Sequence, residues 1–284
     1  MSKKVLVSVL FGTPFPDDWM RGYLENLRTL GQVTRGQWQA KIFMPQARQY
    51  AYDLCAWSGD NGYVEMIDMT LAQFDRLVED KTGVRHTNVL REERPGIWTP
   101  QKLLSCYFPA FGHIFEDYLR EYSWWAHVPW DMVWGRLDRF FVDADDNPDV
   151  IAPEAIAIND CDIYGNDPDA INGCFSLYRN ARTVNRLYRG IPDWRTKMFH
   201  PGPDNKYTFD EYCMTDHCNA MARMGALRFK TGWLMTNDAM PQHWGAPKLH
   251  WGPGATLIDS ATGRECAMFH FKLTKRWPIQ GGAA

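Results

Sequence analysis

Three residues in the C-terminal half have side chains of the kind that bind metals. Cys213, His217 and Cys218 lie within six positions of one another, and thiolate and imidazole groups are the usual ligands of zinc. A structural zinc site needs four ligands, and no second CxxC-like pair accompanies this segment. The segment is therefore predicted to be an ordinary helix.

An acidic pair just before these residues could act on a proton. Asp210 and Glu211 open a helix predicted over residues 210–224. A carboxylate there could serve as a general base. Acidic residues in a first turn are also favourable to the helix dipole without any catalytic role. The residues alone leave both interpretations open.

The familiar catalytic signatures are missing from the chain. It contains no GxGxxG after the first predicted strand, no GxxxxGK[ST], no HExxH and no GxSxG. A dinucleotide enzyme, a P-loop nucleotidase and a classical hydrolase are all disfavoured by this absence.

Composition sets further limits. The 284 residues carry 31 Lys and Arg against 34 Asp and Glu, a net charge of −3, with both signs interspersed. This balance gives no electrostatic basis for binding nucleic acid or an anionic membrane. No apolar run approaches the roughly 20 residues of a membrane span, and the N-terminal run is too short for a signal peptide. The seven cysteines are odd in number and scattered, which indicates reduced thiols. We therefore expect a soluble cytoplasmic protein.

Elements that could position such residues alternate along the chain. Apolar runs predict strands over 5–11, 39–44, 124–134 and 150–158. Helical spacing predicts helices over 17–31, 70–79, 99–122, 137–142, 183–188 and 210–224, and a break of the third near Pro109 stays open. Residues 254–271 are predicted to form a hairpin that turns at 260–263. Alternating strands and helices indicate an α/β fold with a doubly wound, mostly parallel sheet, and the absence of a linker favours one domain over 1–284. Ligands of such sheets bind beyond the carboxyl ends of the strands.

Several segments, in order along nearly the whole chain, carry a shared pattern. They are VLFGTPFP (9–16), PAFGHIFEDYL (109–119), WDMVWG (130–135), GCFSLYRN (173–180), YTFDEY (207–212) and MFHFKLTK (268–275). This ordered set resembles a capsule- and virus-associated family of glycosyltransferases with the GT-A fold. The resemblance implies a nucleotide-sugar-dependent transferase, with UDP as the expected nucleotide and a glycan as the acceptor.

The resemblance also implies roles for individual residues. Asp131 and His270 match the positions that hold Mn²⁺ or Mg²⁺, and Asp210 or Glu211 matches the region of the base in an inverting transfer. The donor would be bound by residues 1–137 and the acceptor by residues 138–284. The positions matching the donor site are Phe11, Gly12, Pro14, Trp130, Asp131, Gly173, Arg179 and Lys272.

The chain departs from the family's pattern at four positions. Pro129 replaces the first Asp of the metal triplet, Cys106 and Phe108 replace an Asp and a Lys, and Arg136 replaces an Asp. Arg136 could pair with Asp138 or with a phosphate. The departures motivate an alternative function, a GT-A fold that binds a carbohydrate or nucleotide without transferring it. A third reading is a metal-independent transferase in which Arg136, Lys272 or Lys275 offsets the diphosphate charge.

Overall fold

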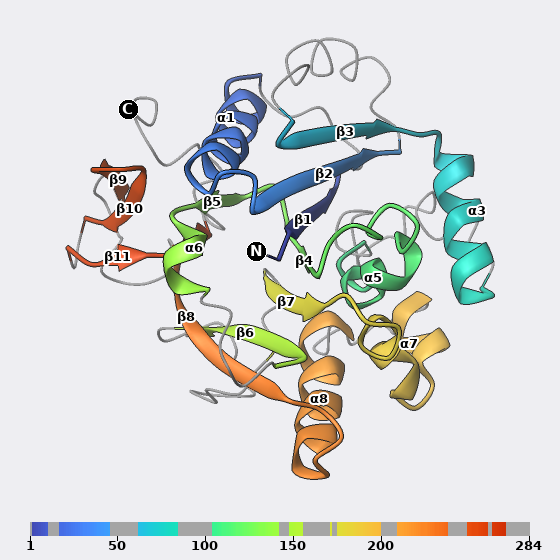
Figure 1. The fold of residues 1–284 in the computed structure, drawn as a ribbon. Helices are drawn as coiled ribbons and strands as arrows, with labels where there is room; N and C mark the ends of the chain where they lie inside the picture. Colours follow the sequence, from blue (N-terminus) through green and yellow to red (C-terminus); the bar gives the residue numbers. More distant parts are fainter. Residues whose placement is uncertain are drawn as a thin grey trace, which may run out of the picture.

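The computed structural model describes residues 2–10, 17–45, 62–84, 104–141, 148–155, 171, 175–199, 209–237, 249–260 and 263–270. Its centre is a nine-stranded sheet, and a three-stranded sheet lies at the far left of Figure 1. No helix within these residues is both long enough and apolar enough to cross a membrane.

The large sheet has the strand order β3-β2-β1-β4-β7-β6-β8-β12-β5. The bounds of its strands are β1 (Lys4–Val9), β2 (Trp38–Met44), β3 (Val64–Asp68), β4 (Trp124–His127), β5 (Met132–Trp134), β6 (Val150–Ala155), β7 (Ser176–Arg179), β8 (Phe229–Asn237) and β12 (Met268–His270).

Strand direction places most carboxyl ends at one edge. β3, β2, β1 and β4 are parallel neighbours, and so are β6, β8 and β12. β7 is antiparallel to both β4 and β6, and β5 is antiparallel to β12. All the strands except β7 and β5 therefore run in the same direction. The predicted α/β class with a mostly parallel sheet is confirmed.

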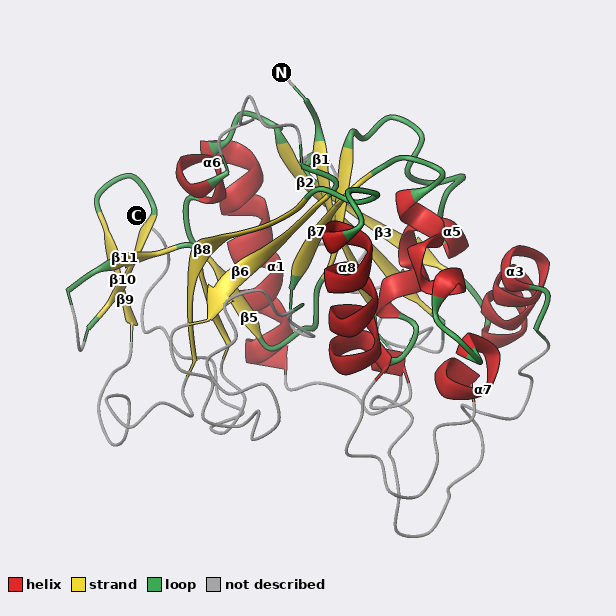
Figure 2. Ribbon diagram, turned by 90° about the horizontal axis from the view of Figure 1, so that it is seen from below, coloured by secondary structure: helices red, strands yellow, loops and turns green. Residues whose placement is uncertain are grey.

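Helices cover both faces of this sheet (Figures 1 and 2). One face, here called the α1 side, carries α1 (Asp17–Val33) and α6 (Leu137–Phe140). The other face, here called the aromatic side, carries α3 (Leu71–Thr82), α5 (Phe111–Ile114), α7 (Trp194–Phe199) and α8 (Met214–Arg223). Short helical turns complete it: 3₁₀ turns η1 (Phe108–Ala110) and η2 (Val184–Gly190), and the π-helical turn η3 (Phe209–Cys213).

Local sequence explains the elements that were predicted most closely. β1 is a β-branched apolar run and is buried along its whole length, as expected for an internal parallel strand. In α1 the buried residues Met20, Tyr23, Leu24, Leu27 and Leu30 recur at helical spacing. α3 begins at a capping box between Thr70 and Gln73 and ends at Gly83, whose φ of 74° is the left-handed conformation that glycine tolerates.

The predicted end of the first helix was wrong. α1 continues through Gly31 to Val33. Close packing against another residue, not a reversal of the chain, requires a glycine at position 31. A Cβ at Gly31 would lie 2.4 Å from the Cβ of Tyr63, so only glycine fits beneath that ring. The reversal comes later, at Arg35 and Gly36, which both have positive φ.

Three other predicted helices differ from the structure. The helix predicted over 99–122 is interrupted in its described part: residues 104–105 are helical, and η1, α5 and turns follow, with several bulky rings packed along the segment. The one predicted over 183–188 is the 3₁₀ turn η2. The one predicted over 210–224 is divided into η3 and α8.

The C-terminal hairpin is present but its second arm is divided. β10 (Thr256–Asp259) pairs antiparallel with β11 (Glu265–Cys266), and β9 (Leu249–Gly252) adds to β10. After Ala267 the chain leaves the small sheet and enters the large one as β12.

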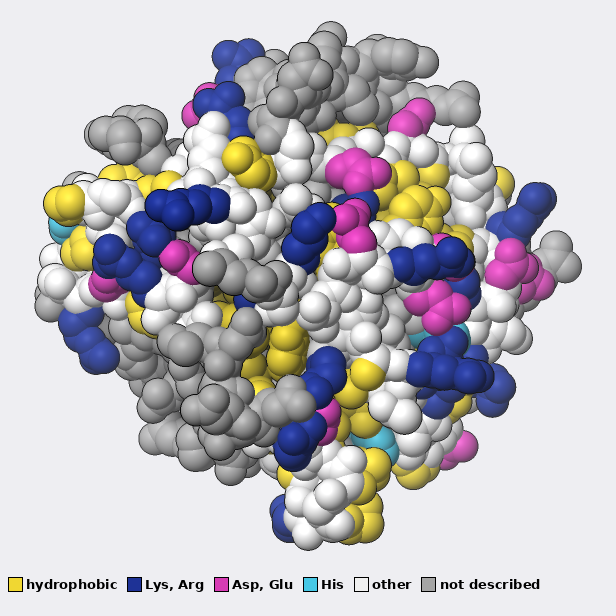
Figure 3. All heavy atoms as spheres, viewed as in Figure 1, with side chains coloured by type: hydrophobic (Ala, Val, Ile, Leu, Met, Phe, Trp, Pro, Cys, Tyr) yellow, Lys and Arg dark blue, Asp and Glu magenta, His cyan; other side chains and the backbone are white. Residues whose placement is uncertain are grey.

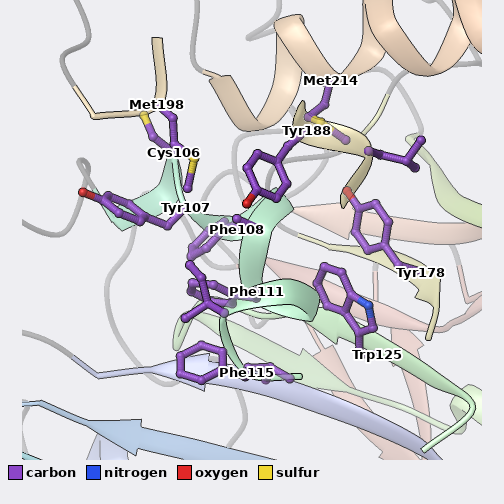
Figure 4. Packing of buried hydrophobic residues seen from close by; sticks show 14 of the residues in the cluster. Cys106, Tyr107, Phe108, Phe111, Phe115, Trp125, Tyr178, Tyr188, Met198 and Met214 are labelled. Atoms are coloured by element: carbon purple, nitrogen blue, oxygen red, sulfur yellow. The ribbon is translucent and has the colours of Figure 1, made fainter. Parts of the chain in front are cut away.

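The two sides of the large sheet contain different cores. On the α1 side the core is rich in Leu and Met, with Leu6, Leu24 and Leu137 among its fully buried members. On the aromatic side, Phe108, Phe111 and Phe115 lie along η1 and α5, and Trp125 and Tyr178 belong to the same buried cluster (Figure 4). The Trp125 and Tyr178 rings stack 4.5 Å apart, and a Cβ at Gly112 would lie 2.3 Å from the Trp125 indole.

The charged side chains mix on the surface. Figure 3 shows Lys and Arg beside Asp and Glu over the same face, in keeping with the net charge of −3. On the aromatic side, Glu116 accepts hydrogen bonds from Lys81 and from Arg186, each 2.9 Å long. Such partly exposed pairs contribute little stability individually.

Candidate functional site

The sheet brings Asp131 and His270 to the same edge. β4 ends at His127, and Asp131 follows it by four residues, directly before β5. In the antiparallel pair of β5 and β12, His270 lies opposite Met132, the residue next to Asp131. His270 also lies opposite Asn237 at the end of β8. Two residues 139 positions apart in sequence are thus neighbours in the sheet at the carboxyl ends of its parallel strands.

Asp131 is a buried acid on the α1 side. Its exposed fraction is 7%, and Tyr23 of α1 and Ser8 of β1 are buried near it. Burial raises the pKa of Tyr23 well above its ordinary value, the Ser8 hydroxyl lowers it, and the charge of Asp131 raises it further.

The carboxylate and the histidine fit a hard divalent cation in their chemistry. Carboxylate oxygens are the preferred ligands of Mg²⁺ and Mn²⁺, and imidazole also accepts Mn²⁺. Within the described residues, no cluster of three or more His, Cys, Asp or Glu side chains forms a metal site. The His270 side chain lies outside what the structure describes.

The residues beside Asp131 are only partly buried. Pro129 and Trp130 are both half-buried, and Trp130 packs between the α1-side core and the core under the small sheet. Trp130, one of the predicted donor residues, directly precedes Asp131 in the chain.

The acidic pair of the second candidate group lies on the aromatic side. Asp210 and Glu211 are on η3, a π-helical turn, and such turns occur frequently at functional sites. Asp210 is 4% exposed and lies among buried groups, whereas Glu211 is half-buried. The charge of Asp210 acts on Cys106 and Tyr178, and burial first, then that charge, raises the pKa of Cys106 to about 12.

Aromatic rings connect this acidic pair to the end of β4. His127 is fully buried and stacks on Phe108 with ring centroids 4.7 Å apart. The ring centroids of His127 and Tyr178 are 6.1 Å apart. Cys106 and Phe108, two of the departures from the family's pattern, are both core residues here. A carboxylate in place of Cys106 would be buried next to the charge of Asp210, which is unfavourable.

Two predicted or alternative anion-binding residues have other partners. Arg136 makes a bidentate pair with Asp138, with Nε–Oδ1 and Nη2–Oδ2 distances of 2.8 and 2.6 Å. Arg179 is at the other edge of the sheet, opposite Trp124 at the start of β4, where its Nε lies 3.5 Å from the Asp149 carboxylate. The structure therefore does not bring Arg179 together with Asp131.

The remaining predicted donor residues, Phe11, Gly12, Pro14, Gly173 and Lys272, lie outside the described residues, as does Lys275. The zinc-like segment is helical as predicted: Cys218 is buried in the core, and His217 packs against Gly190. A residue that the sequence did not single out, Asn26, hydrogen-bonds to β5 next to the site.

A family model and several solved structures match the chain. The model described as a family of unknown function, DUF6625, matches residues 58–241. Curated protein sequences give no match.

The solved structures are glycosyltransferases with about a tenth of their residues identical. The galactosyltransferase LgtC, in complex with donor and acceptor sugar analogs, matches at 10% identity and a TM-score of 0.46, covering 95% of this chain and 87% of its own. Mouse xyloside xylosyltransferase 1 matches at 11% and 0.45, covering 98% and 100%. Core-mannan synthase A of Aspergillus fumigatus, in an Mn/GDP form, matches at 8% and 0.40, covering 81% and 73%. At these values the function of this chain has to be inferred from its own residues.

Proposed function

This chain belongs to the DUF6625 family, and we propose that it is a glycosyltransferase that transfers a sugar from a nucleotide sugar, with UDP as the nucleotide, to a glycan. One observation carries the proposal. The pairing of β5 with β12 sets His270 beside the Asp131 segment at the carboxyl edge of the sheet, where α/β sheets bind ligands. The sequence resemblance had picked out the same two residues.

Asp131 and His270 would hold Mn²⁺ or Mg²⁺. The bound cation would neutralise the charge that develops on the departing diphosphate. Asp131 suits this role because its carboxylate is buried, and charge interactions are stronger where water is excluded. Trp130, half-buried beside it, offers an aromatic face to the donor.

The acidic pair on η3 would supply the base of an inverting transfer. The acceptor hydroxyl gives its proton to a carboxylate, its oxygen bonds to the anomeric carbon, and the bond from that carbon to the diphosphate oxygen breaks. A base has to reach the acceptor within hydrogen-bond distance, which favours the half-buried Glu211 over the buried Asp210. Asp210 would then stabilise the π-helical turn η3. In this assignment residues 1–137 bind the donor and residues 138–284 the acceptor.

The test is release of UDP from a panel of UDP-sugars with and without Mn²⁺. Asp131→Asn should lower the metal-dependent release on the order of 100-fold or more, since such charge stabilisation is worth several kcal/mol. The matched control is Asp149→Asn, which removes a carboxylate charge that pairs with Arg179 at the other edge and should leave release unchanged. Equal losses in both variants, or full activity in EDTA, would refute the metal role of Asp131.

A second candidate is a module that binds a nucleotide or carbohydrate without turnover. Pro129 in the metal triplet favours it, as do Cys106 and Phe108, which are core residues rather than charged donor contacts. UDP at 100 times its dissociation constant should raise the free energy of unfolding by about 2.7 kcal/mol in a thermal-shift assay. Such a shift without UDP release from any donor would select the module.

A further inference from the structure

The position of Asp131 depends on a strand with little support of its own. Asp131 directly precedes β5, which has only three residues and is the last strand of the large sheet. β5 pairs with β12 on one edge, where Val133 lies opposite Phe269. Three residues of pairing are a weak constraint on register, and a slip of one residue would turn every side chain to the opposite face.

The other edge of β5 is held by one side chain of α1. The Asn26 amide nitrogen donates to the Trp134 carbonyl oxygen, and the Trp134 amide nitrogen donates to the Asn26 amide oxygen, each at 2.8 Å. Asn26 is 4% exposed, so both bonds lie in the interior. The side chain thus pairs with Trp134 as a neighbouring strand would. Losing it would leave a buried carbonyl or amide unsatisfied, which is costly.

The same face of α1 also reaches the surroundings of Asp131. Tyr23 lies three residues before Asn26, which places both on one face of the helix. The Tyr23 side chain is 1% exposed, and the charge of Asp131 acts on its hydroxyl, which indicates that this face of α1 lies near Asp131.

We propose that this face of α1 positions Asp131, with Asn26 fixing the register of β5 against β12 through its two hydrogen bonds to Trp134. Asn26 is a positioning residue, since it is not assigned contact with substrate. The proposal rests on the proposed function for its metal, but the placement of the 129–134 segment can be measured without one. Groups that orient metal ligands typically change metal affinity 10- to 100-fold when they are removed.

Asn26→Asp is the sharpest variant, because it keeps the size and the acceptor but replaces the donor to Trp134 with a carboxylate oxygen. Asn26→Ser shortens the side chain without burying a charge and is the second variant if Asn26→Asp does not fold. The matched control is Asn180→Asp. Asn180 follows β7 at the other edge, where its amide nitrogen donates to the carbonyls of Leu119 and Tyr122 at 2.7 and 2.9 Å.

Two measurements are needed. The first is Mn²⁺ binding, monitored through the electron paramagnetic resonance signal of free Mn²⁺. The second is hydrogen exchange of the peptide containing residues 130–134. Asn26→Asp and Asn26→Ser should each weaken Mn²⁺ binding about 10-fold or more and speed that exchange, and Asn180→Asp should change neither. Unchanged exchange and affinity in Asn26→Asp would overturn the proposal. If the wild-type protein takes up no Mn²⁺, the proposed function loses its metal, and the exchange result alone decides the positioning role.

Discussion

The two sides of the large sheet hold their buried carboxylates by different means. On the α1 side, Asp131 directly precedes a short strand, β5, that is fixed by backbone pairing and by the Asn26 amide. On the aromatic side, Asp210 lies on a π-helical turn that leads directly into α8 and is surrounded by buried aromatic residues. Hydrogen bonds are directional, whereas ring packing depends on volume and shape. We therefore expect the Asp131 segment to be sensitive to lost donors and the Asp210 segment to lost volume.

The largest effect is expected from Trp125→Ala on the aromatic side. The Trp125 indole is fully buried, stacks on Tyr178 and donates to Asn185 at 2.8 Å. Its loss should lower the free energy of unfolding by about 3–5 kcal/mol, measured by urea denaturation. The folded variant should still take up Mn²⁺ as the wild type does, unlike Asn26→Asp. A fall in Mn²⁺ affinity as large as that of Asn26→Asp would show that the two sides do not act separately.

A pH titration should give an intermediate effect and sharpen the contrast. Burial, and then the charges of Arg186 and Arg189, lower the pKa of His113 to about 4 from the ordinary value of 6.5. As the pH falls, His113 therefore binds a proton in the unfolded chain before it does so in the folded chain. The free energy of unfolding should consequently fall as the pH drops from about 6.5 to 4.

The comparison variant is His113→Asn, which cannot titrate in this range and also alters the 2.8 Å contact to the Tyr188 hydroxyl. Its free energy of unfolding, measured in urea at several pH values, should fall less steeply over the same interval than that of the wild type. Equal slopes in both proteins would contradict the assignment of this pH dependence to His113.

The smallest effect is expected from the charged surface over the same side. Glu116→Gln removes a charge that pairs with Lys81 and Arg186, but the Glu116 side chain is 32% exposed. The loss in unfolding free energy should be below about 1 kcal/mol and should shrink further at high salt. Glu121→Gln, which removes a more exposed pair with Lys3, is the control and should cost less still. A loss that rivals Trp125→Ala would mean that charge, not ring packing, holds this side.

Local patterns predicted the elements whose signals are contained in their own residues. β1, β2 and α3 matched because apolar runs, helical spacing and the Thr70 cap are all short-range features. β7 has only four residues and shows no periodicity that sequence reasoning can detect. Gly31 was interpreted as a helix stop because the Tyr63 ring that requires it lies 32 positions away.

The residues of the candidate site show the same difference between what short-range patterns predict and what depends on distant contacts. Asp131 and His270 were named through a resemblance to a family, and the strand register then showed them at the same edge. Asn26 was missed because a polar residue on an amphipathic helix ordinarily faces solvent. Its partner for both hydrogen bonds, the backbone of Trp134, is 108 residues away. Arg179 was named from a motif that does not specify at which edge of the sheet a four-residue strand ends.

The Asn26 amide has one more consequence, which concerns other copies of the chain. β5 is an outermost strand, and outermost strands with unpaired backbone groups recruit strands from other molecules and begin aggregation. Because the outward-facing amide and carbonyl of Trp134 are already occupied, an incoming strand finds no partner at that residue. The contact that aligns an acid with its histidine thus also shields that side of the molecule from intermolecular β-addition.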